Sequence, residues 1–167
     1  MGSSATMSSL LKLGLVLAVA LLVAVPVALA AEETEREKYV ATVEPICKAN
    51  SDANASILKG VKGQVQQDKL VPAGKRFVRA STALGKTVTK IDQVPRPAED
   101  NAKLTKWIGY LRKEKTFLQQ IGGALKSKDK YHAQKLAVEL NKNNNKANNT
   151  VISFGFEECR IDSSRFL

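Results

Sequence analysis

The two cysteines are the residues of this chain best suited to chemistry. Cys47 lies in "VEPICKAN" and Cys159 lies in "FGFEECRI", near the other end of the sequence. Neither belongs to a CxxC pair, and neither has a companion histidine motif, so a metal or redox-active site is not indicated. Two such cysteines form a structural disulfide in an oxidising compartment and stay free in a reducing one. The compartment therefore decides their chemistry.

The N-terminal segment indicates export. Residues 13–31 are nineteen uncharged, mainly apolar residues that follow Lys12 and precede the acidic stretch "EETERE". Pro26 and the small residues after it resemble a signal-peptidase site, so we expect residues 1–30 to be a signal peptide that is cleaved after Ala30. An uncleaved membrane anchor over residues 13–31 is the alternative, because nineteen apolar residues are just long enough to span a bilayer.

An exported chain enters an oxidising space, and this context favours a disulfide between Cys47 and Cys159. Closing a loop of about 113 residues would restrict the unfolded chain and stabilise the fold by about 4.8 kcal/mol, if loop entropy is the main term. Two free buried thiols are the alternative.

No other set of residues points to catalysis or to a metal centre. His132, the only histidine, is expected at the exposed start of a helix, where histidine is seldom a base or a ligand. Glu44, Glu114 and Glu139 occur singly, without the Glu-x-x-His spacing of two-metal bundles. "LGKTVTK" at 84–90 lacks the spacing and the preceding strand of a phosphate-binding loop. We therefore expect a non-enzymatic protein without a metal or cofactor.

Positive charge is concentrated in the middle of the chain. The net charge is +10, and residues 59–115 carry 14 basic against 5 acidic residues. This excess favours contact with an anionic surface polymer or an acidic protein, although a solvated lysine-rich face explains it without any partner. No aromatic platform for base stacking is visible, so dedicated nucleic-acid binding is not expected. The expected contact residues are Lys75, Arg76, Arg79, Lys86, Lys90, Lys103, Lys106, Arg112 and Lys113.

Hydrophobic spacing predicts helices. Apolar residues recur at intervals of three and four through residues 31–167, and no segment alternates with period two, so we expect a single all-α domain. The first helix should begin at a capping box of Thr34 and Glu37. Its apolar stripe continues to Val65, and Pro45 should bend it.

The breaks between helices predict the topology. "VPRP" at 94–97 ends the second helix, because each residue before a proline is pushed toward extended conformations. "KSKDK" at 126–130 separates the third helix from the fourth, and Gly155 should end the fourth. Short connections between four long amphipathic helices predict an antiparallel up-down-up-down four-helix bundle, with the C-terminal tail stapled to the first helix by the disulfide.

Asparagine, a poor helix former, fills six of the nine positions 141–149, yet the apolar spacing runs through them. Asn144 and Asn148 are one turn apart, as are Asn50 and Asn54 in the first helix. We expect these two pairs to form one polar core layer that links the first and fourth helices near the disulfide. The layer would fix the packing register or line a ligand pocket. Asparagines that face solvent are the alternative.

Three segments carry a resemblance: "YVATVEPICKAN", "VPRPAEDNAKLTKWIGYL" and "NNTVISFGFEECRI". They resemble a group of uncharacterised exported helical proteins of actinobacterial type, and the likeness covers most of the chain after residue 30. The resemblance implies secretion, an all-helical fold and the pairing of Cys47 with Cys159. It implies no activity and assigns no site.

Two classes of function remain. The first is a non-enzymatic structural or interaction protein of the cell exterior, whose positive face contacts anionic surface polymers. The second is a small-molecule binding protein that uses the asparagine layer in the bundle core. The basic residues support the first class, and the buried amides support the second.

Overall fold

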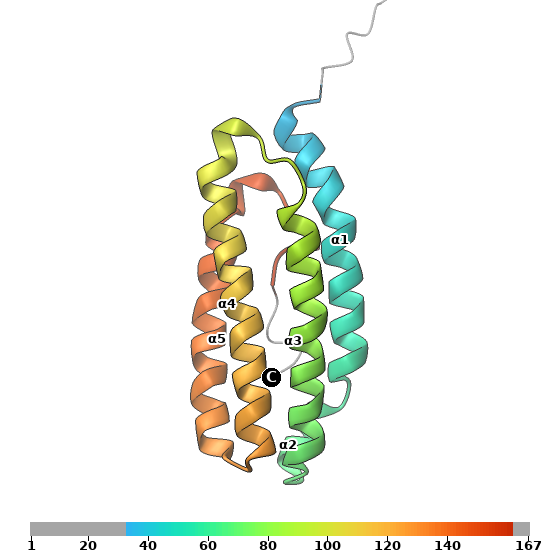
Figure 1. Cartoon of the computed structure of the whole chain (residues 1–167), viewed down its shortest axis with the longest axis vertical. Coiled ribbons are helices and arrows are strands. Elements are labelled where there is room, and N and C mark those ends of the chain that lie inside the picture. The colour runs from blue at the N-terminus through green and yellow to red at the C-terminus, as the bar shows by residue number, and fades with distance from the viewer. Residues whose placement is uncertain (1–32, 162–167) are drawn as a thin grey trace, which may run out of the picture. The chain divides into compact units, whose positions relative to one another are not determined.

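A computed structural model describes residues 33–161 of the chain, and within that range it contains helices and no strand. Four long helices form an antiparallel bundle (Figure 1). They are α1 (Glu35–Leu58), α3 (Leu70–Asp92), α4 (Asn101–Lys126) and α5 (Lys130–Thr150). A short α2 (Val61–Gln66) and two 3-10 turns, η1 (Ala98–Asp100) and η2 (Ile152–Phe154), connect and follow them. The predicted all-α bundle is confirmed.

The export segment expected over residues 1–30, and the alternative anchor over residues 13–31, lie outside the described residues. Between residues 33 and 161, no helix is both long enough and apolar enough to cross a membrane. These residues belong to one compact unit.

α1 starts where the sequence predicts and ends earlier. The Thr34 hydroxyl accepts the N–H of Glu37 at 3.2 Å, and the Glu37 carboxylate accepts the N–H of Thr34 at 2.7 Å, which completes the capping box. The helix continues through Pro45 and ends at Leu58. Gly60 then takes a φ of 78°, in the left-handed region that glycine adopts at little cost. The single first helix expected from the apolar stripe is therefore two helices.

The other predicted breaks hold with small shifts. Asp129 caps α5, because its side chain accepts the N–H of His132 at 2.8 Å. α5 ends at Thr150, a few residues earlier than the apolar spacing suggests, and η2 follows it. Gly155, with a φ of 70°, then turns the chain into the C-terminal tail. We use the term tail for residues 155–161.

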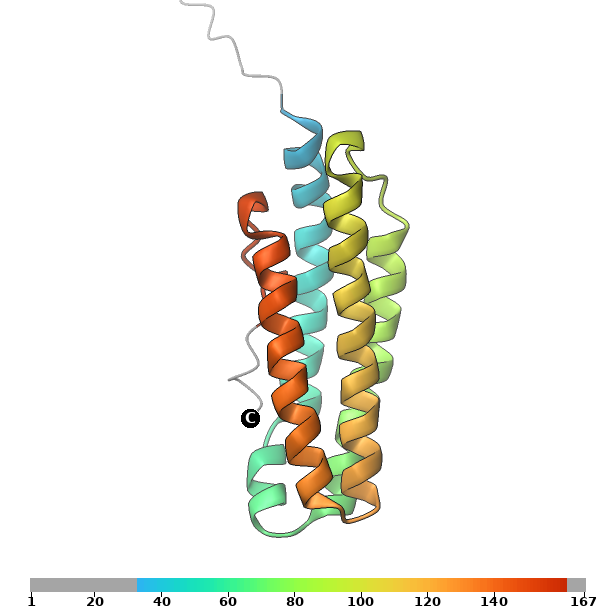
Figure 2. The ribbon, with the colours of Figure 1, turned by 90° about the vertical axis from the view of Figure 1, so that its left-hand side faces the viewer.

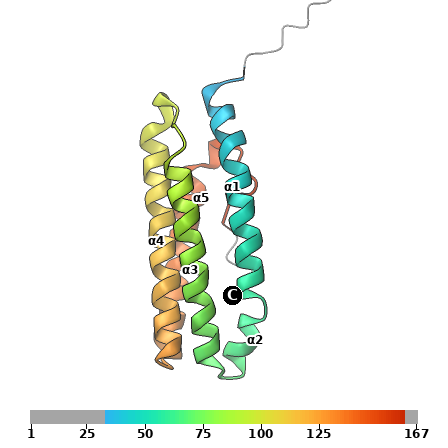
Figure 3. The ribbon, with the colours of Figure 1, turned by 45° about the vertical axis from the view of Figure 1, so that its right-hand side comes forward.

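The tail occupies the fourth side of the bundle. α3 packs between α1 and α4, and α5 packs against α4. After η2 the chain turns back and runs alongside α1 rather than leaving the bundle (Figures 2 and 3). α1 and α5 are thus joined mainly through the tail, which contacts both helices. This arrangement decides where the buried polar residues lie.

α3 and α4 approach closely at Gly74 and Gly122. A Cβ atom on Gly74 would lie 2.5 Å from the carbonyl oxygen of Gly122, and one on Gly122 would lie 2.7 Å from Cγ2 of Val78. We expect Gly74→Ala to lower the free energy of unfolding by about 1–3 kcal/mol, because the two backbones must separate.

Gly123→Ala is the matched control for Gly74→Ala. A Cβ atom on Gly123 meets nothing within 4 Å, so this change should stabilise α4 by about 0.5–1 kcal/mol through helix propensity alone. Urea denaturation of both variants measures the difference. Equal effects of the two changes would contradict the close approach of the helices.

Candidate functional site

Cys47 of α1 and Cys159 of the tail form a disulfide, with their Cα atoms 4.9 Å apart. The predicted pairing is confirmed, and neither cysteine is free. Both residues are buried. A structural disulfide between distant parts of a chain indicates an oxidising, non-cytoplasmic compartment.

Hydrogen bonds hold the tail on both of its sides. The carboxylate of Glu44 in α1 accepts the backbone N–H groups of Glu157 and Glu158, each at 2.8 Å. On the other side, the amide of Asn148 in α5 donates to the carbonyl of Ile161 and accepts its N–H, both at 2.9 Å. The tail is therefore attached to α1 and to α5 independently of the disulfide.

Aromatic side chains anchor the start of the tail. The ring of Phe156 stacks on Trp107 of α4 with centroids 5.3 Å apart, and on Phe154 at 5.7 Å. The guanidinium of Arg36 in α1 lies 5.0 Å from the centre of the Phe154 ring and donates to both carboxylate oxygens of the buried Asp100, at 2.6 and 2.7 Å. These contacts fix the ends of α1, α4 and α5 relative to one another.

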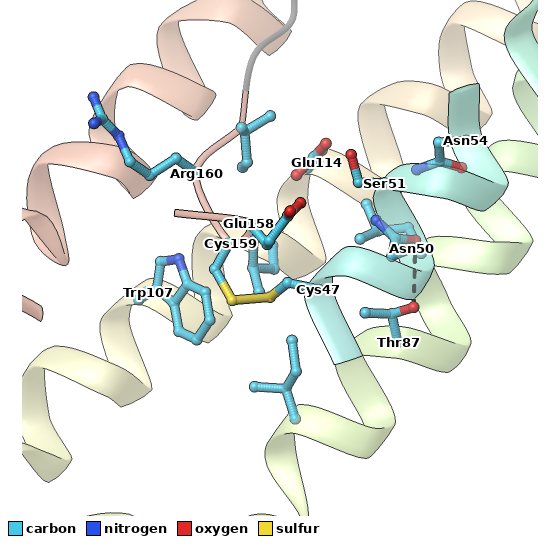
Figure 4. Close-up of a pocket in the computed structure, with 14 residues that line it drawn as sticks. Cys47, Asn50, Ser51, Asn54, Thr87, Trp107, Glu114, Glu158, Cys159 and Arg160 are labelled. Atoms are coloured by element: carbon cyan, nitrogen blue, oxygen red, sulfur yellow. Dashed lines mark hydrogen bonds between the residues drawn. A yellow bond between two sulfur atoms is a disulfide. The ribbon is translucent and has the colours of Figure 1, made fainter. Parts of the chain in front are cut away.

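A pocket of about 70 Å³ lies next to the disulfide, between α1, α3, α4 and the tail (Figure 4). We call it the interior pocket. Its polar lining residues are Asn50, Ser51 and Asn54 from α1, Thr87 from α3, Glu114 from α4, and Glu158 and Arg160 from the tail. The volume is sufficient for about five water molecules.

Glu114 is the least expected residue of the interior pocket. It is 8% exposed, and its Oε2 atom has no hydrogen-bond partner. Burial raises the pKa of Glu114 from an ordinary 4.5 to about 8, because desolvation penalises the carboxylate. The carboxyl group is therefore mostly protonated at neutral pH.

The spacing in α4 contains a signal for Glu114 that the analysis of single glutamates missed. The buried stripe contains Leu111 and Leu118, which are about two helical turns apart. The stripe position midway between them, one turn from each leucine, must be residue 114 or residue 115. Both positions are charged, Glu114 and Lys115. A charged residue was therefore required on the buried stripe, or close beside it.

Asparagines of α1 complete the polar side of the interior pocket. Asn54 is 6% exposed, and its Oδ1 atom has no hydrogen-bond partner. The Oδ1 atom of the half-buried Asn50 accepts the hydroxyl of Thr87 at 3.3 Å, as the dashed line in Figure 4 shows. In the same view Glu114 enters on the side of the pocket where Ser51 and Asn54 lie. The lining therefore offers both hydrogen-bond donors and acceptors.

The structure separates the four asparagines expected in one layer. Asn50 and Asn54 line the interior pocket, whereas Asn148 holds the tail. Asn144 is buried as predicted, with an unpartnered Oδ1 atom. Asn143, which the apolar spacing had left out, is also buried and donates to a carbonyl of α4. Within residues 33–161 no hydrogen bond links α1 to α5 through these amides, because the tail lies between the two helices.

A second, open depression of about 530 Å³ lies between α2, α3 and α4. We call it the basic groove, defined by Lys75, Arg76, Arg79 and Lys126. No carboxylate lines it. Arg76 also donates to the carbonyl oxygens of Ile57 and Lys59 at the end of α1, so its guanidinium stabilises that helix end as well.

Lys126 was not predicted for this groove. It joins α3 because the helices approach closely at Gly74, where an added Cβ atom would lie 2.9 Å from Cγ of Lys126. The charge pattern of a sequence does not show where two helices approach each other at glycines. It shows which helix carries each basic residue, and it does not show that Lys126 lies beside α3.

Two of the other expected contact residues, Arg112 and Lys113, interact with side chains outside the groove. Arg112 pairs with Asp92 of α3 at 2.7 Å. Lys113 lies 5.7 Å from the ring centre of Tyr110, whose carbonyl accepts from Asn143 of α5. Neighbouring residues of α4 thus point to opposite flanks. The other expected contact residues are exposed along α3 and α4, namely Lys86, Lys90, Lys103 and Lys106.

Comparisons with protein-family models, with curated proteins and with solved structures gave no match to this chain. Within the described part of the chain, no group of three or more histidine, cysteine or acidic side chains is arranged to hold a metal ion.

Proposed function

We propose that this chain is an exported, non-enzymatic helical-bundle protein that contacts an anionic polymer at the cell exterior through the basic groove. The observation that carries the proposal is the convergence of four cationic side chains, from α3 and α4, on one groove that no carboxylate lines. Like charges gathered in a concave surface raise the local potential and attract anions.

Some basic residues outside the groove are paired with carboxylates, whereas three of the four groove residues have no such partner in the described part of the chain. Lys130, Lys142 and Arg112 each lie within 3.0 Å of a carboxylate. Lys75, Arg79 and Lys126 form no ion pair with any residue from 33 to 161, and all three are exposed. Their charge is therefore available to a partner.

Export supports the choice of an extracellular polymer as the partner. The uncharged segment 13–31 resembles a signal peptide, for which we propose cleavage near Ala30. The disulfide requires an oxidising compartment. A basic protein in that compartment meets cell-surface polymers that carry phosphate or carboxylate groups, and repeated charges on such polymers can bind several lysine and arginine residues at once.

Retention on a polyanion column tests the proposal. We expect the triple change Lys75→Gln, Arg79→Gln and Lys126→Gln to lower markedly the salt concentration needed for elution from heparin, because three contacts between opposite charges are lost. Circular dichroism would establish that the variant keeps its helical fold.

The matched control removes three charges elsewhere. Lys103→Gln, Lys106→Gln and Lys113→Gln cause the same change in net charge on exposed positions of α4 outside the groove. This control should elute close to the unaltered protein. Equal losses for both triple variants would show that net charge, and not the basic groove, determines retention.

A further inference from the structure

The interior pocket contains polar atoms that the protein itself does not satisfy. Glu114 Oε2, Asn54 Oδ1 and Trp107 Nε1 are buried without hydrogen-bond partners, and all three residues line the pocket. Buried polar groups in folded proteins are nearly always paired, so each exception requires a reason. The residues that carry these three exceptions gather around one space.

No interaction within the described part of the protein explains why Glu114 is buried. It accepts no hydrogen bond and forms no ion pair with another described residue, so it fixes neither the register of α4 nor its contact with α1. An apolar side chain of similar size would continue the stripe between Leu111 and Leu118 at lower energetic cost. A contact made outside the polypeptide therefore explains the carboxyl group better than packing does.

The lining determines the chemistry of a ligand. The carboxyl group of Glu114 lines the space together with the hydroxyl of Ser51, and Figure 4 shows the amide nitrogens of Asn50 and Asn54 on the side toward Glu114. An ionised carboxyl group only accepts hydrogen bonds, so a ligand that binds it must donate. A volume of about 70 Å³ holds about five water molecules, and each water occupies about as much space as one non-hydrogen atom of a ligand. The ligand is therefore limited to roughly five non-hydrogen atoms.

The charges around the interior pocket favour a cation. Its ionisable lining residues are Glu114 from α4 and Glu158 and Arg160 from the tail, while α1 and α3 contribute none. Glu158 is half-buried and lies 3.8 Å from Lys48. Arg160 is exposed, and Figure 4 shows its guanidinium directed away from Glu114. The deep part of the pocket therefore holds a carboxyl group without a neighbouring positive charge.

We propose that the interior pocket binds a small organic cation, a primary ammonium or guanidinium compound, whose N–H groups donate to the carboxyl group of Glu114. This site is separate from the basic groove and takes a ligand of opposite charge, so the two proposals can fail independently. Binding ionises Glu114, and its proton passes to the solvent. Affinity should then rise with pH up to about 8, the raised pKa of this carboxyl group.

The single tryptophan makes the proposal measurable. Trp107 lines the interior pocket and is the only tryptophan of the chain, so its indole N–H gives one assignable nuclear magnetic resonance signal. Guanidinium and methylammonium chloride at millimolar concentration are the probes, and urea is the neutral compound that matches guanidinium in shape. The carbon signal of the Glu114 carboxyl group provides a second readout.

We expect guanidinium to shift both signals saturably and urea to leave them nearly unchanged. Glu114→Gln should weaken guanidinium binding about tenfold or more, because a charge-assisted contact is lost. Glutamine is neutral and similar in size to the protonated carboxyl group, so this variant should fold. Glu139→Gln, the same change at an exposed position of α5, should bind as the unaltered protein does.

Three results would overturn the proposal. Equal affinity for urea and guanidinium would show that the pocket does not select charge. Unchanged guanidinium affinity in Glu114→Gln would place the cation elsewhere. The absence of a saturable shift in both signals would show that small cations do not enter the pocket.

Discussion

Replacing both Cys47 and Cys159 with alanine should lower the free energy of unfolding by about 4 to 5 kcal/mol. The disulfide closes a loop over a sequence separation of 112, and long loops lose the most entropy when their ends are joined in the unfolded chain. Stability in urea, measured by circular dichroism for the double variant and the oxidised protein, gives the difference. Reduction of the unaltered protein should reproduce the loss.

The same variant should also loosen the tail in the folded state. Hydrogen exchange at the amides of Glu157, Glu158 and Ile161 reports on this, because each amide donates to a side chain of α1 or α5. A loss of stability below about 1 kcal/mol would contradict the account of the disulfide. It would mean that Glu44, Asn148 and the aromatic contacts hold the tail without it.

Glu114→Gln should make the protein more stable at pH 8 by roughly 3 to 5 kcal/mol and leave it nearly unchanged at pH 4.5. The pKa of this carboxyl group is about 8 in the folded protein and 4.5 in the ordinary, solvated state. Between these values the unfolded chain releases the proton while the folded protein keeps it. Stability therefore decreases as pH rises from 4.5 to about 8, at about 1.4 kcal/mol for each unit of pKa shift.

Urea denaturation of Glu114→Gln and the unaltered protein across this pH range isolates the effect, since the other titrating groups are common to both. Glu139→Gln is the control, because Glu139 is exposed and its change should leave the pH profile nearly parallel to that of the unaltered protein. Parallel profiles for Glu114→Gln and the unaltered protein would show that the carboxyl group is not buried in solution.

Periodicity and cysteine chemistry predict most of the fold. The helix start at Thr34 follows from its capping box, and the pairing of Cys47 with Cys159 follows from the expected oxidising compartment. The break at Gly60 was not predicted, because the apolar spacing continues across it into α2. Apolar spacing shows which side of a helix is buried. It does not show that Gly60 adopts a left-handed conformation, which ends α1 and lets α2 begin.

The interior pocket was only partly predictable. Burial of Asn54 and Asn144 follows from their places on the apolar stripes. Their hydrogen-bond partners could not be predicted, because the tail has no periodic pattern that would place it between α1 and α5. Asn148 forms its hydrogen bonds with Ile161 of this tail. Glu114 was treated as an isolated acid, although its place between Leu111 and Leu118 marks it as buried. Side chains from four elements meet at the pocket, and spacing within one element cannot show that.

Mapping the surface that contacts a polyanion tests the role of the basic groove most directly. Amide signals of the isotopically labelled protein should be followed while a short polyphosphate is added at physiological salt. The largest shifts should cluster at Gln64, Lys75, Arg79 and Lys126, which line the groove. Shifts spread evenly over the exposed lysines of α3, α4 and α5, or shifts that vanish at physiological salt, would contradict this role.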